Sequence, residues 1–320
     1  MLSRTAENLF WMARDMERAE NTARMLDVGF RMSLLPSTID KQALHFEPII
    51  AIAPGSGRFH ELYGELTHET ILRYVALEPA NGGSICSLIR HARENARAQR
   101  SAISSEAWES LNSTWLQVQN LDFDGLKRWG YRDFFDWVKE RSHLFRGVVF
   151  GTMLHDDAFR FIRLGTFIER ADNTARILDV KYHVLLPETE EVGGYVDYYQ
   201  WGALLRSVGA FRAYRKVYHD TVYPWRIAEL LILRADMPRS LHHCYANLIG
   251  TLDELADKKH LECRSLAGQT YALLKYGRID KIFSGGLHEF LSSFIDSNNA
   301  LGGQIEEDFL MVRAVLAGAA

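Results

Sequence analysis

Apolar residues along this chain recur every three or four positions, and no stretch alternates apolar and polar residues over many positions. The first spacing is typical of helices that bury one face, whereas alternation is typical of strands. Proline, which interrupts helices, occurs only 7 times in 320 residues. The pattern therefore predicts an all-α protein.

Prolines, glycines and capping serines divide this pattern into separate helices. In the first half we expect helices over residues 3–35, 41–52, 59–77 and 84–103, one that begins at Ser104 or Ser105, and two between residues 125 and 150. The second half is expected to follow the same plan.

One stretch of twelve residues occurs twice, 152 positions apart. Residues 17–28 read Glu-Arg-Ala-Glu-Asn-Thr-Ala-Arg-Met-Leu-Asp-Val, and residues 169–180 read Glu-Arg-Ala-Asp-Asn-Thr-Ala-Arg-Ile-Leu-Asp-Val. Most identical positions are polar, although a repeat kept only for packing would retain its apolar positions first. We therefore expect two tandem helical-bundle repeats, residues 1–150 and 151–320, packed about a pseudo-two-fold axis as one compact body. The two helices that carry the repeated stretch are expected to contact each other near this axis.

A polar stripe runs along each copy of the repeated stretch. In the first copy Glu17, Asn21 and Arg24 lie opposite the main apolar face, with Phe10 and Val28 beside them. Apolar residues on both sides of a polar stripe indicate that the stripe is buried. Buried carboxylates and guanidiniums need partners, so they either pair with each other or face a shared polar cavity.

Composition and charge narrow the functional classes. Apolar residues make up 47% and charged residues 24%, as in ordinary soluble globular proteins, and the net charge of -4 makes a general nucleic-acid binder unlikely. The three cysteines, Cys86, Cys244 and Cys263, are odd in number and far apart, which favours a reducing cytoplasm. There is no signal-peptide pattern and no apolar run of about 18 residues, so no membrane association is expected.

The sequence also resembles a known family over essentially its whole length. Residues 2–12 and 17–24, and residues 152–170 in the second half, are similar to signatures of the bacterial alpha-E family, all-helical proteins named for a Glu-Arg motif. Some positions depart from its pattern. Ala13 and Asp15 stand where the family pattern has a glycine and an aromatic residue, and His155, Phe159 and Thr166 replace an arginine, a tryptophan and an arginine.

The resemblance implies a companion of a circularly permuted ATP-grasp ligase, often encoded beside or fused to it. A transglutaminase-like protein and a proteasome-like peptidase are implied in the same system, whose chemistry is amide or peptide-bond formation. The chain itself has no phosphate-cradling Gly-x-x-x-x-Gly-Lys-Ser/Thr loop and no Gly-x-Ser-x-Gly elbow. We therefore expect an accessory or substrate-binding partner of the ligase, without a cofactor of its own.

Other interpretations remain open at this stage. The chain could be an enzyme that acts on an amide or peptide at a Glu17/Glu169 cleft, or a pure helical scaffold in which both carboxylates are closed by arginines. A carboxylate metal site is not expected, because the i,i+3 carboxylate pairs lack the histidine of di-iron bundles. No catalytic residue is assigned. The candidate substrate- or partner-binding residues are Arg4, Glu7, Asn8, Glu17, Arg18, Asn21, Arg24, Asp156, Glu169, Arg170, Asn173 and Arg176.

Overall fold

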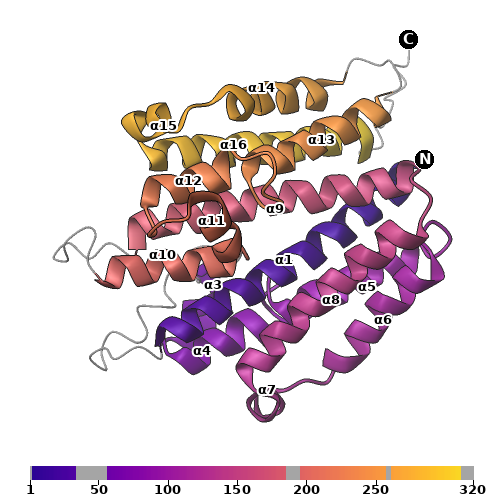
Figure 1. Ribbon diagram of the computed structural model, residues 1–320. Coiled ribbons are helices and arrows are strands. Elements are labelled where there is room, and N and C mark those ends of the chain that lie inside the picture. Colours follow the sequence, from indigo (N-terminus) through magenta and orange to yellow (C-terminus); the bar gives the residue numbers. More distant parts are fainter. Residues whose placement is uncertain (1, 34–55, 185–194, 257–260, 311–320) are drawn as a thin grey trace.

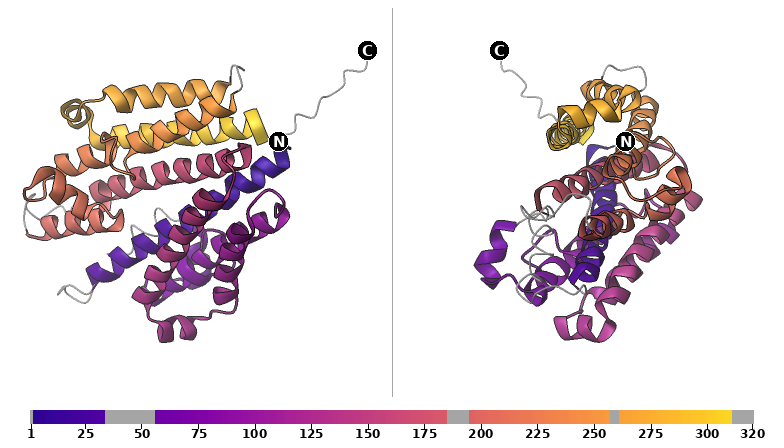
Figure 2. Two further views of the ribbon diagram at one scale, coloured as in Figure 1. Left: turned by 45° about the vertical axis from the view of Figure 1, so that its right-hand side comes forward. Right: turned by 60° about the vertical axis from the view of Figure 1, so that its left-hand side comes forward.

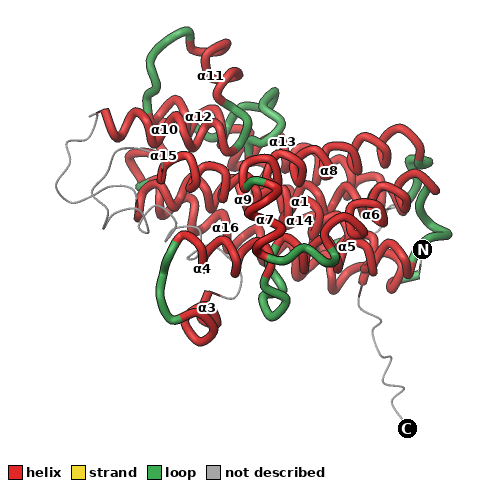
Figure 3. The backbone as a smooth tube through the Cα atoms, turned by 90° about the horizontal axis from the view of Figure 1, so that it is seen from below, coloured by secondary structure: helices red, strands yellow, loops and turns green. Residues whose placement is uncertain are grey.

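The computed structural model describes residues 2–33, 56–184, 195–256 and 261–310 (Figure 1). Every regular element in these ranges is a helix (Figure 3), which confirms the expected all-α class. None of the described helices combines the length and the apolarity that crossing a membrane requires.

The helices fall into two series along the chain. The first contains α1 (Ser3–Ser33), α3 (Ser56–Tyr63), α4 (His68–Leu72), a π-helical turn η3 (Arg73–Leu77), α5 (Ile85–Ala98), α6 (Ser105–Val118), α7 (Phe123–Trp129) and α8 (Tyr131–Thr152). The second contains α9 (Asp157–Val184), α10 (Tyr195–Ser207), α11 (Phe211–Tyr218), α12 (Pro224–Ile232), α13 (Leu241–Leu255), α14 (Glu262–Tyr276), α15 (Ile279–Gly285), α16 (Leu287–Ile305) and a π-helical turn η4 (Glu306–Leu310).

Some predicted boundaries are wrong. A single helix over residues 59–77 does not form, because Gly64 takes a positive φ of 70° and Thr67 starts a new helix through a capping box with Thr70. Helix α5 ends at Ala98 rather than at residue 103. The helix expected over residues 41–52 lies outside the described residues.

Matching caps and glycines occur in the two series. The Ser84 hydroxyl accepts the Ser87 N–H at the start of α5, and the Ser240 hydroxyl accepts the His243 N–H at the start of α13. Helices α8 and α16 both begin after a glycine in the left-handed region, Gly130 with φ 94° and Gly286 with φ 96°. Both pairs of positions are 156 residues apart.

The two Glu-Arg helices, α1 and α9, lie side by side at the centre of the molecule (Figure 2). Helices α5 and α8 pack against α1, and α13 and α16 pack against α9. A Cβ atom at Gly165 would lie only 2.2 Å from the Phe10 carbonyl oxygen and 3.2 Å from the Ala13 Cβ. The expected contact between these helices is therefore confirmed, and the absence of a side chain at Gly165 permits it.

Two apolar cores meet along α1. The larger contains Leu9, Phe10 and Met12 of α1 together with residues of both halves, such as Phe145 of α8 and Leu248 of α13. The smaller lies around the C-terminal part of α1 and is built from η3, α5, α7 and α8, all in the first half. Since α1 contributes to both cores, its polar stripe is held in the interior.

Candidate functional site

The repeated Glu-Arg motifs exchange ion pairs between α1 and α9. Arg18 on α1 holds Glu169 on α9, with Nε 2.6 Å from Oε1 and Nη2 2.7 Å from Oε2. In return, Arg170 on α9 holds Glu17 on α1, with Nε 2.9 Å from Oε1 and Nη2 2.8 Å from Oε2. Both are two-pronged arginine–carboxylate pairs, the geometry that best fixes two side chains relative to each other.

Glu17 sits in a larger buried cluster with Glu20. Arg146 of α8 donates Nη1 to Glu17 at 2.8 Å and also to Glu20, and Arg239, from the turn before α13, lies 3.2 Å from Glu17 and donates to Glu20. Glu17 is only 1% exposed and Glu20 is fully buried. Burial alone would raise the pKa of Glu17, but the surrounding guanidiniums outweigh it and lower this pKa to about 2. This cluster is therefore closed and fully ionised.

Glu169 has fewer partners and lies closer to solvent. Besides Arg18, it pairs with Arg14, whose Nε is 3.1 Å from Oε2 of Glu169. Burial opposes ionisation, but Arg18 and Arg14 lower the pKa of Glu169. Within the described chain, no three histidine, cysteine, aspartate or glutamate side chains lie together as a metal site would require.

A polar cavity adjoins this second pair. We call it the α1–α5 cavity. It has a volume of about 630 Å³, within the range typical of small-molecule sites. Its lining residues come from α1, from α5 and from the turn before α5: Arg4, Glu7, Asn8, Trp11, Asp15, Arg18, Gly82, Leu88, His91, Glu94 and Asn95. Arg18 belongs both to the cavity wall and to the ion pair with Glu169, so the two features are continuous.

Most polar side chains of this cavity are unpaired. Among the described residues, Arg4, Glu7, Asn8, His91 and Asn95 make no hydrogen bond or ion pair. The lining contains no serine, threonine, cysteine or lysine, and its ionisable side chains are Arg4, Glu7, Asp15, Arg18, His91 and Glu94. The cavity therefore offers several polar groups that can contact a ligand.

Asp15 is the most unusual residue of the cavity. It is 6% exposed, yet its carboxyl group makes no hydrogen bond or ion pair with any described residue. Burial raises the pKa of Asp15 to about 7, although the nearby charges of Arg18 and Arg14 act in the opposite direction. A desolvated carboxyl group that titrates near neutral pH is typical of functional sites.

Hydrogen bonds of Asn81 hold the turn that contributes Gly82 to the cavity wall. The buried Asn81 donates Nδ2–H to the Tyr74 carbonyl oxygen at 3.1 Å, and its Oδ1 accepts the Gly83 N–H at 2.9 Å. Its own carbonyl oxygen accepts the Ser84 N–H. The start of α5 is thus fixed to η3, and the α5 wall is fixed with it.

The structure separates the predicted site residues into three groups. Arg4, Glu7, Asn8 and Arg18 line the α1–α5 cavity, whereas Glu17, Asn21, Arg24, Glu169 and Arg170 belong to the buried network between the helices. The other three lie elsewhere. Asp156 accepts the Ala158 and Phe159 N–H groups at the start of α9, Arg176 pairs with Asp172 within α9, and Asn173 is buried with no partner for its Oδ1.

Glu17 and Glu169 are both buried against arginines, and the α1–α5 cavity beside the second pair is lined by Arg18. The sequence interpretation missed Asp15, His91 and Asn95 as cavity residues, and Arg14, Arg146 and Arg239 as partners of the motif. One signal was present. Arg4, Asn8, Trp11, Asp15 and Arg18 follow a four-three spacing that places them on one helix face.

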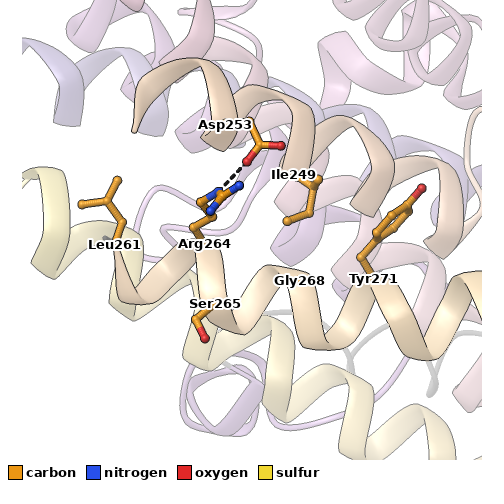
Figure 4. Close-up of a pocket in the computed structure, with 7 residues that line it drawn as sticks. All are labelled: Ile249, Asp253, Leu261, Arg264, Ser265, Gly268 and Tyr271. Atoms are coloured by element: carbon orange, nitrogen blue, oxygen red, sulfur yellow. Dashed lines mark hydrogen bonds and ion pairs between the residues drawn. The ribbon is translucent and has the colours of Figure 1, made fainter. Parts of the chain in front are cut away.

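A second pocket, between α13 and α14, shows the opposite character (Figure 4). Its volume is about 420 Å³, and Arg264 and Asp253 meet at its edge, with Nε 2.5 Å from Oδ1. Its charges are closed on each other, whereas those of the α1–α5 cavity are open. The latter is therefore the stronger candidate for a ligand site.

Comparison with known proteins identifies the family but no individual relative. No curated protein and no solved structure matches the chain. The Alpha-E family model, described as a predicted alpha-helical domain with a conserved ER motif, matches residues 1–310. The chain has Glu-Arg at positions 17–18 and 169–170, where the side chains pair between α1 and α9, and it belongs to the Alpha-E family.

Proposed function

We propose that this protein is an accessory, substrate-binding partner of a circularly permuted ATP-grasp ligase that forms amide or peptide bonds. The observation that carries the proposal is the α1–α5 cavity, which offers several unpaired polar side chains that can hold a ligand. Such a site can present a substrate, while the ligase binds ATP and uses it to activate the carboxylate that is joined. The implied setting is a bacterial cytoplasm, with a transglutaminase-like protein and a proteasome-like peptidase in the same system.

We also propose that residues 1–150 and 151–320 are tandem copies of one unit, related by a pseudo-two-fold axis between α1 and α9. The exchanged Arg18–Glu169 and Arg170–Glu17 pairs support this, since a two-fold axis relates each contact to its reverse. Superposing one half on the other tests it: a rotation far from 180° would contradict the proposal.

The functional test is reconstitution with a circularly permuted ATP-grasp ligase from the same organism, the partner that the proposal names. Product formation, followed by mass spectrometry, should depend on the presence of this protein. It should fall at least about tenfold when Asn95→Leu replaces the unpaired amide of the α1–α5 cavity with an apolar group of similar shape, a loss equivalent to about 1.4 kcal/mol. Arg264→Gln, which alters the α13–α14 pocket, is the matched control and should leave the yield unchanged.

The outcomes separate the three interpretations. Full activity of the ligase without this protein would contradict a partner role. Amide formation or cleavage by this protein alone would favour an enzyme, and an effect that survives Asn95→Leu would favour a scaffold.

A further inference from the structure

We propose that the α1–α5 cavity binds a small zwitterion, a free α-amino acid or a dipeptide, with its ammonium group on Asp15 and its carboxylate on Arg18. This deepens the proposed function and rests on it for the role of the ligand. The binding chemistry itself follows from the side chains alone.

Asp15 can accept a cationic or hydrogen-bonding occupant. Buried polar groups in folded proteins nearly always have a partner, yet the Asp15 carboxyl has none among the described residues although it is 6% exposed. It lines the cavity, so a ligand can reach it. An ammonium group offers both the positive charge and the donors that an ionised carboxylate accepts.

Arg18 can bind an anion without releasing Glu169. A guanidinium has five N–H donors, and the pair with Glu169 uses Nε and one donor of Nη2. The remaining donors make no hydrogen bond within the described chain. Because Asp15 and Arg18 are three residues apart on α1, they lie next to each other on one helix face, about 5–6 Å apart at Cβ. That separation suits the two charged ends of one small molecule.

The charge balance favours a ligand that is neutral overall. Arg14 and Arg18 on α1 face Glu169 on α9 and Asp15, so these four sum to zero when all are ionised. The nearby Asp172–Arg176 pair of α9 adds no net charge. An anion alone would leave Asp15 unsatisfied, and a cation alone would leave the free Arg18 donors unsatisfied. A zwitterion satisfies both.

The α5 wall does not cancel this preference. There, Glu94 is already held by Arg93 and Arg97, and the pKa of His91 is lowered by burial and by the neighbouring Arg90, which favours its neutral form. Further along α1, Arg4, Glu7 and Asn8 are unpaired at the outer end of the cavity. They can contact the side chain of an amino acid or the second residue of a dipeptide.

Isothermal titration calorimetry on the full chain alone tests the proposal. The probes are glycine, alanine, glutamate and lysine, the dipeptide Ala-Ala, and two blocked forms of alanine: N-acetylalanine, which lacks the ammonium group, and alaninamide, which lacks the carboxylate. At least one free amino acid or the dipeptide should bind, and each blocked form should bind at least about tenfold more weakly. Comparison of alanine with Ala-Ala distinguishes the two sources of the zwitterion.

The matched variants are Asp15→Asn and, as control, Arg264→Gln. The first should weaken binding at least about tenfold and the second should not change it. Binding to the unaltered protein near pH 6.5 should also release a proton, seen as a buffer-dependent heat, because the ammonium ionises Asp15.

Absence of binding to every unblocked probe, or equal binding of the blocked and free forms, would overturn the inference. These comparisons use the unaltered protein and hold even if the variant misfolds. Binding by this protein without any effect on the ligase would instead refute only the proposed function.

Discussion

Glu17 and Glu169 occupy matching positions of the repeated motif, but replacing each by glutamine should lower the free energy of unfolding by different amounts. Arg170 is buried and has Glu17 as its only carboxylate within 4 Å among the described residues. Glu17→Gln therefore leaves a buried guanidinium without its counter-charge, which typically costs about 3–5 kcal/mol. Arg146 and Arg239 still have Glu20 as a carboxylate partner, so their loss of Glu17 adds little to this cost.

Glu169→Gln should be milder. The side chains of its partners, Arg14 and Arg18, are 16% and 25% exposed, and Arg18 also lines a cavity. Asp15 lies beside both and can ionise in response. The expected loss is therefore about 1–2 kcal/mol, in the lower part of the range of about 1–3 kcal/mol for leaving a polar group without its partner.

Urea unfolding of both variants at pH 7, followed by circular dichroism, measures the two losses. Glu17→Gln should lose at least about 1 kcal/mol more than Glu169→Gln, which is the gap between the two ranges above. Equal losses, or a larger loss for Glu169→Gln, would refute the contrast between a closed cluster and a pair beside an open cavity.

Steric, acid–base and catalytic behaviour give the remaining predictions. Gly165→Ala should lower the free energy of unfolding by about 1–3 kcal/mol, because its Cβ would meet the Phe10 carbonyl oxygen. Gly147→Ala, in open space on α8, should raise it by up to about 1 kcal/mol. The opposite order of stability in urea melts would contradict this prediction. The folded-state pKa of Asp15, about 7, lies above its ordinary value of 3.8, so the protein loses stability as Asp15 ionises between these two pH values. Asp15→Asn does not titrate, so its free energy of unfolding should rise relative to the unaltered protein by up to about 4 kcal/mol between pH 4 and pH 7. A difference that does not change with pH would contradict this. The purified protein alone should neither hydrolyse ATP nor join amino acids, and ATP turnover abolished by a substitution in this chain would disprove that.

The sequence was sufficient to predict the helical class and the contact between α1 and α9. Both depend on local information: apolar periodicity defines helices, and two identical polar stripes flanked by apolar residues must be buried against something. The break at Gly64 was missed because glycine is tolerated within helices, and only the backbone geometry shows that its φ is positive.

The site itself depends on packing between distant segments, and so only part of it was predictable. Arg146 and Arg239 are single arginines without a local motif, and nothing near them in sequence indicates that they reach Glu17 and Glu20. The cavity stripe on α1 follows a regular spacing, but the identity of its opposite wall, α5, is a long-range property. Asp15 looked like a departure from the family pattern, and only its burial without a partner reveals it as a candidate ligand contact.

The exchanged pairs between α1 and α9 have the geometry of a homodimer interface, in which each subunit gives the other what it receives. A homodimer must build both of its sites from the same residues. Within one chain that constraint is lifted. Arg14 and Asp15 have Thr166 and Phe167 at the corresponding positions 152 residues later. Under the proposed duplication, the half that contains Arg14 and Asp15 carries the proposed binding site, and the other half supports it.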